Sequence, residues 1–153
     1  MKLFIAFVFL LNPLQAEFLM TEFPSKDQII ITADVYMPYE ETAPFILLFH
    51  QAGWSRGEYR ESALTFNAMG FNCMAVDLRS GSAINGVKNE THKQASKDGL
   101  STKYVDAYQD IEASVEFARE SFAKGKLIIL GSSYSSALVL KYAGDHQDVD
   151  RSE

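Results

Sequence analysis

The sequence lacks several features that would assign it to a specialised class of protein. Cys73 is the single cysteine among 153 residues, which excludes an internal disulfide and a cysteine-based zinc site. No run of basic residues occurs, and the formal net charge is -6 with a pI near 5.1. Because nucleic-acid binding depends on clustered lysine and arginine, no nucleic-acid partner is expected.

Histidine is scarce as well. The chain contains only His50, His92 and His146, and no two of them have the spacing of metal ligands. A glycine-rich loop after the first strand, which a dinucleotide-binding fold requires, is also missing. The sequence therefore predicts neither a metal site nor a cofactor.

No apolar run is long enough to cross a bilayer, which takes roughly 20 residues. The longest, Leu3 to Leu11, follows Lys2 and precedes a small residue, Ala16. This layout is typical of a secretory signal peptide. We expect residues 1–16 to be removed, a mature chain that starts at Glu17, and a periplasmic or secreted protein; the alternative is an uncleaved apolar N-terminus.

With 47% hydrophobic and 22% charged residues, residues 17–153 have the composition of one globular domain. Apolar segments alternate with helical patterns, which predicts an α/β fold: a mostly parallel sheet with an antiparallel N-terminal hairpin and helices on both faces. The polar, glycine-interrupted segment 80–103 is expected to be an extended loop. Strands are predicted over 18–23, 28–37, 45–49, 71–76 and 126–130, and helices over 57–69, 104–122 and 134–143.

A serine-rich turn joins the last predicted strand to the last predicted helix: Gly131-Ser132-Ser133-Tyr134-Ser135. A nucleophile on such a turn has a strained backbone that exposes its hydroxyl, and the residues two before and two after it must be small. Ser133 meets this rule because Gly131 and Ser135 hold those positions, although Ser135 replaces the second glycine of G-x-S-x-G. Ser133 is the predicted nucleophile; the alternative is a helix cap without a catalytic role.

Two backbone amides are predicted to stabilise the oxyanion that forms when Ser133 attacks a carbonyl group. One belongs to Tyr134, at the positive end of the last helix. The other comes from the loop that starts at His50, directly after the predicted strand 45–49, whose unbroken apolar run is typical of a strand buried on both sides. By position its donor is Ala52, or else Gln51.

Other residues around the predicted strand ends are expected to be structural. The turn that starts at Asp77 follows strand 71–76, and its charged side chains can bind loop backbone near the site. The residues to which we assign such a supporting role are His50, Gly53, Asp77, Arg79, Gly131 and Ser135.

These motifs together resemble the α/β-hydrolase superfamily, in order and spacing, over roughly residues 20–145. The general appearance is similar to bacterial dienelactone hydrolases and esterases. Dienelactone hydrolases carry a cysteine nucleophile where this sequence has Ser133, so their substrate is not carried over. The resemblance implies a serine hydrolase acting on small carboxylic esters, thioesters or lactones. The segments that carry it are Ser25-Lys26-Asp27, the His50 loop (similar to H-G-x-G), the Asp77 turn (similar to D-x-R-G-x-G) and the Ser133 elbow.

The resemblance also implies a triad acid and a histidine after the nucleophile. The candidate His146 follows the helix that leaves Ser133, and ten residues of helix rise roughly 15 Å, so we reject it as the base. We expect a hydrolase domain without its C-terminal strands, from a gene fragment or an early stop, with weak or absent activity by itself. The alternative is a non-catalytic scaffold that serves as a binding or interaction module, or an inactive fragment.

Overall fold

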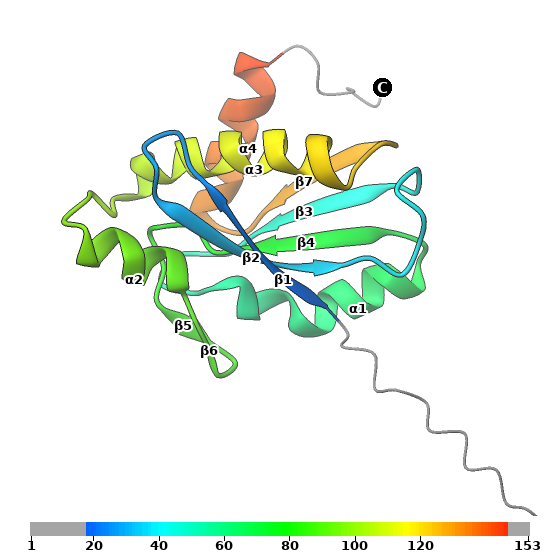
Figure 1. Ribbon diagram of the computed structural model, residues 1–153, viewed down its shortest axis with the longest axis horizontal. Coiled ribbons are helices and arrows are strands. Elements are labelled where there is room, and N and C mark those ends of the chain that lie inside the picture. The colour runs from blue at the N-terminus through cyan, green and yellow to red at the C-terminus, as the bar shows by residue number, and fades with distance from the viewer. Residues whose placement is uncertain (1–17, 147–153) are drawn as a thin grey trace, which may run out of the picture.

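The computed structural model describes residues 18–146; the predicted signal segment lies outside them. Its main sheet has the strand order β1-β2-β4-β3-β7 (Figure 1). β3 pairs in parallel with β4 and β7, whereas β2 pairs antiparallel with β1 and β4. The predicted α/β class and N-terminal hairpin are confirmed. The strands are β1 (Leu19–Pro24), β2 (Ile30–Tyr36), β3 (Phe45–Phe49), β4 (Asn72–Val76) and β7 (Leu127–Gly131).

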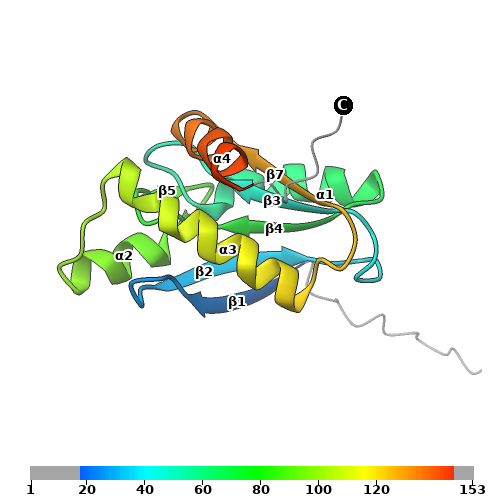
Figure 2. The same cartoon turned by 90° about the horizontal axis from the view of Figure 1, so that it is seen from above.

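Helices cover both faces of this sheet, as expected. α3 and α4 lie on one face and α1 on the other, and Figure 2 shows α3 crossing the strands from above. Within residues 18–146, no helix is long and apolar enough to cross a membrane. The helices are η1 (Arg56–Tyr59), α1 (Arg60–Ala68), α2 (Glu90–Lys97), η2 (Tyr104–Ala107), α3 (Tyr108–Ser121) and α4 (Tyr134–Asp145).

The apolar strand β3 is buried on both sides, as its lack of a polar face predicted. Its odd-numbered residues pack in the cluster under α3 and α4, and Ile46 and Leu48 pack in the cluster that includes Ala63 of α1. Alternate side chains of a strand point to opposite faces. The strand is therefore fixed in the middle of two apolar layers, and its carboxyl end is positioned rigidly.

Helix boundaries differ slightly from the prediction at several points, and the helix predicted from residue 57 begins as the 3-10 turn η1. The segment that starts at Tyr104 begins as a 3-10 turn, and the apolar side chain of Val105 in this turn is 69% exposed. A 3-10 turn has three residues per turn and shifts side chains relative to the α-helical stripe. α4 continues past Gly144 and ends at Asp145.

The prediction of an extended loop over 80–103 is wrong. This segment contains a short hairpin, β5 (Ala83–Ile84) with β6 (Val87–Lys88), followed by α2. Asn89 starts the helix because its side chain accepts a hydrogen bond from the His92 amide. Gly86 and Gly99, which we interpreted as breaks, have positive φ on either side of the helix.

Candidate active site

The three predicted loops leave the sheet side by side. In the register of the parallel strands, Phe49 of β3 is opposite both Val76 of β4 and Gly131 of β7. The loops that follow these residues therefore start in one row, at the edge where parallel sheets place their ligands.

The backbone at Ser133 is strained and its side chain is exposed. Its φ of 57° and ψ of -120° lie in a region that residues with a side chain rarely adopt. A Cβ on Gly131 would lie 2.6 Å from backbone atoms of Ser135 and Ser136, so only glycine fits there. This is the close crossing on which the choice of Ser133 rested.

The elbow is attached to the end of β3 through one carbonyl group. The oxygen of Phe49 accepts from the Ser132 amide at 3.0 Å, and the hydroxyls of Ser135 and Tyr59 lie 2.9 and 2.8 Å away. Ser135 is buried and also accepts from the Ser132 amide at 2.8 Å. Ser135 thus holds the turn, and Tyr59 is a supporting residue that the sequence did not reveal.

The three candidate oxyanion donors differ in whether their backbone amides already donate a hydrogen bond. The amide of Gln51 donates to the Glu58 carboxylate at 2.8 Å. Among residues 18–146, the amides of Ala52 and Tyr134 have no hydrogen-bond acceptor. Gly53 has a φ of 75°, which lets the loop turn directly after Ala52. The geometry favours Ala52 over Gln51 as the donor of this loop.

His50 is buried, and both of its ring nitrogens are occupied. Nδ1 lies 2.8 Å from the Gln51 carbonyl, and Nε2 accepts from the Leu78 amide at 2.9 Å. Burial lowers the pKa of His50 to about 4. A neutral imidazole bonded in this way ties the β3 loop to the β4 loop and has no nitrogen left for a proton transfer.

Asp77 organises the start of its turn around Arg56. Its carboxylate accepts from the backbone and the guanidinium of Arg56, at 2.7 and 2.6 Å, and from the Glu90 amide at 2.9 Å. Burial raises the pKa of Asp77 to about 6, against the opposing effect of Arg56. Asp34, also buried, lies 2.9 Å from Arg56 Nε. The carboxylate is therefore engaged in holding η1 and α2.

Arg79 connects three elements that are distant in sequence. Its buried guanidinium binds Asp110 of α3 at 2.6 Å and Asp27 of the β1–β2 turn at 2.7 Å. Ser25 of the same turn donates to Asp110 at 3.1 Å. Burial raises the pKa of Asp110, against the opposing effect of Arg79. The Ser25-Lys26-Asp27 motif thus serves to seat the hairpin on the Asp77 turn.

Asn89 is a second supporting residue that the sequence did not reveal. Its buried amide group donates to the Leu78 carbonyl at 2.8 Å and lies 3.2 Å from His50 Nε2. A Cβ on Gly81 would lie 2.1 Å from this amide, so the Asp77 turn packs directly on it. Its position before a polar helix was a capping signal, but its tertiary contacts were not readable. We call His50, Asp77, Arg79 and Asn89 the strand-end network.

No histidine of the chain is hydrogen-bonded to Ser133 within the described residues. Nδ1 of His92 lies 2.7 Å from the Arg79 carbonyl. His146 stacks on Tyr142 at the opposite end of α4, with Nδ1 3.0 Å from the Tyr142 carbonyl. The 18–146 region also holds no group of three or more side chains suited to a metal ion.

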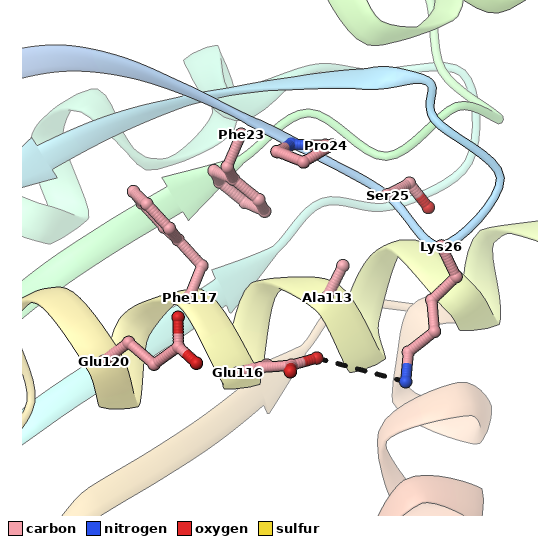
Figure 3. Close-up of a pocket in the computed structure, with 8 residues that line it drawn as sticks. All are labelled: Phe23, Pro24, Ser25, Lys26, Ala113, Glu116, Phe117 and Glu120. Carbon is pink, nitrogen blue, oxygen red and sulfur yellow. Dashed lines mark ion pairs between the residues drawn. The ribbon is translucent and has the colours of Figure 1, made fainter.

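A pocket of about 290 Å³ lies away from the elbow. Phe23 of β1 and Phe117 of α3 stack at 4.2 Å, and Lys26 pairs with Glu116 at the rim (Figure 3). The sheet order places three strands between β1 and β7. This pocket is therefore separate from the site around Ser133.

Comparison with solved structures gives the same fold at low sequence identity. A thermostable carboxyl esterase from Bacillus coagulans matches with a TM-score of 0.67 and 20% identity over 86% of this chain and 41% of its own. An esterase from Pyrococcus furiosus matches with a TM-score of 0.63 and 16% identity over 87% and 49%. An epoxide hydrolase from an endophytic Streptomyces matches with a TM-score of 0.58 and 19% identity over 88% and 35%. The chain thus spans less than half the length of these enzymes.

A search of curated proteins finds no match. The model of one protein family, described as serine aminopeptidase, S33, matches residues 40–152. This stretch includes the His50 loop, the Asp77 turn and the Ser133 elbow. The chain belongs to this α/β-hydrolase family.

Proposed function

We propose that this domain carries the nucleophile of a serine hydrolase that cleaves carboxylic esters, thioesters or lactones. The observation that carries the proposal is the geometry of the elbow. Ser133 is exposed on a strained turn, and the amides of Tyr134 and Ala52 have no acceptor among the described residues. The esterases among the similar folds support an ester substrate.

In the proposed reaction, Oγ of Ser133 bonds to the carbonyl carbon of the substrate. The carbonyl oxygen becomes an oxyanion that accepts hydrogen bonds from the amides of Tyr134 and Ala52. Collapse of this intermediate releases the alcohol or thiol and leaves an acyl-serine, which water then hydrolyses. The serine proton must pass to a base. Because each histidine of the chain is bonded elsewhere, we place the base and its acid outside residues 1–153.

Labelling with a fluorophosphonate tests the role of Ser133, since Oγ displaces fluoride from phosphorus in one step. The gene product that contains residues 1–153 should be labelled, and Ser133→Ala should not. Ser132→Ala is the matched control and should keep its label, because Ser132 lies on the same turn but has the bulky residues Leu130 and Tyr134 two positions before and after it. Equal labelling of wild type and Ser133→Ala would rule out Ser133 as the nucleophile, and absence of label in wild type would favour the non-catalytic scaffold.

A further inference from the structure

An aromatic surface lies beside the elbow. Tyr134 directly follows Ser133, and the ring of Tyr104, at the start of η2, packs against it with centroids 4.6 Å apart and planes tilted by 35°. The hydroxyl of Tyr134 is hydrogen-bonded to Ser80 Oγ in the β4 turn. The Tyr134 ring is thus held at its face and at its tip. We call the two rings the tyrosine platform.

The outer part of this platform is exposed. The side chain of Tyr104 is 53% exposed, and Val105 and Leu100 near it in the chain are 69% and 40% exposed. Single exposed apolar residues are ordinary on protein surfaces. Tyr104 differs from such residues because its ring contacts that of Tyr134, which directly follows the proposed nucleophile, and exposed apolar surface in such a place is typical of a ligand contact. The side-chain hydroxyl of Tyr104 makes no hydrogen bond within residues 18–146, and the described contact of its ring is with the ring of Tyr134.

We propose that the tyrosine platform binds a planar aromatic group of the substrate and makes the enzyme prefer aryl-containing esters to alkyl ones of equal size. The inference rests on the proposed role of Ser133. Because Tyr134 directly follows Ser133 and its ring contacts that of Tyr104, a substrate bonded to Ser133 can place an aromatic group against the platform. Ring contacts between aromatic groups favour binding by roughly three- to tenfold beyond the effect of buried area.

The test compares labelling rates of four fluorophosphonates. In the first pair, a benzyl or a cyclohexylmethyl group is bonded to phosphorus through carbon and stands for the acyl group of an ester. In the second pair, the same two groups are bonded to phosphorus through oxygen and stand for the alcohol. Wild type should react faster with the benzyl member of one pair, and that pair identifies the side of the ester that meets the platform. Tyr104→Ala should lower this preference by about three- to tenfold, whereas Tyr104→Phe should keep it.

Tyr39→Ala is the control, because Tyr39 is 41% exposed and lies by Asn72 at the opposite end of β4. Tyr39→Ala should leave the labelling rates of the benzyl and cyclohexylmethyl probes unchanged. An equal loss for benzyl and cyclohexylmethyl probes in Tyr104→Ala, or no preference in wild type, would overturn the platform while Ser133 stays the labelled residue. Labelling that survives Ser133→Ala would instead overturn the proposed function, and the platform with it.

Discussion

The elbow and the strand-end network lie at the same edge of the sheet but differ in whether their polar side chains are hydrogen-bonded. Ser133 is exposed, and its hydroxyl has no hydrogen-bond partner within residues 18–146. In the network, both nitrogens of His50, both oxygens of Asp77 and all three guanidinium nitrogens of Arg79 are bonded.

This difference separates the proposed nucleophile from the supporting groups. A histidine and an aspartate near a serine suggest a triad in sequence, but His50 and Asp77 are bonded to loop backbone and Arg56 and have no capacity left for Ser133. Changes in the network should therefore act on stability, and changes at Ser133 should act on chemistry. The following variants test that division.

The largest effect is expected from Arg79→Leu. The change leaves the carboxylate of Asp110 buried without the guanidinium 2.6 Å away. An unpaired buried charge costs about 3–5 kcal/mol, so the free energy of unfolding in urea should fall by that amount. Arg119→Leu is the control, since the exposed Arg119 donates only to the Gly125 carbonyl, and it should change stability by less than about 1 kcal/mol. Similar losses in the two variants would contradict the buried role of Arg79.

The parts of the fold that follow from local pattern were predictable. β3 was predicted from an unbroken apolar run, and the elbow was predicted from the sizes of the residues around Ser133. The size rule works because the crossing at Gly131 involves atoms within five residues of it. Such short-range constraints can be predicted from residues that are close together in the sequence.

The parts that depend on distant residues were not predictable. Arg79 meets Asp27 and Asp110 across 52 and 31 residues, and Ser135 meets the Phe49 carbonyl across 86. α2 was missed because it is short and polar and buries only Thr91 and Ala95. Its stability comes from the contacts of its cap rather than from an apolar stripe.

The next effect is a dependence of stability on pH that arises from His50. Its folded-state pKa of about 4 lies below the ordinary value of 6.5. Between these values the unfolded chain binds a proton that the folded protein does not. The contribution of neutral His50 to the free energy of unfolding is therefore fully present above pH 6.5. It falls by about 3 kcal/mol in total as the pH falls to 4.

Asp77 acts in the opposite direction over an overlapping range. Burial raises its pKa to about 6, so its contribution to the free energy of unfolding is present at low pH and is lost as the pH rises through 6.

The variant His50→Gln separates the effect of the histidine from that of Asp77. The stability difference between wild type and His50→Gln, measured by chemical unfolding, should shrink by about 3 kcal/mol from pH 7 to pH 4. A difference that stays constant over this range would show that His50 titrates normally in the fold.

The smallest effect on stability is expected at Ser133, where one substitution should raise the free energy of unfolding relative to another. Glycine adopts positive φ without the steric cost that a side chain has at the φ of 57° of Ser133. Ser133 makes no capping hydrogen bond to α4, so its replacement removes no support from the helix. Ser133→Gly should therefore be about 1 kcal/mol more stable than Ser133→Ala, and its melting temperature should be about 3 °C higher.

Ser133→Ala is the matched reference because both variants lose the hydroxyl and should both lose fluorophosphonate labelling. Only the backbone strain differs between them. Equal melting temperatures would mean that the turn at Ser133 relaxes at no cost. A higher value for Ser133→Gly would mean that the fold spends stability on exposing this one hydroxyl, which no residue of the strand-end network does.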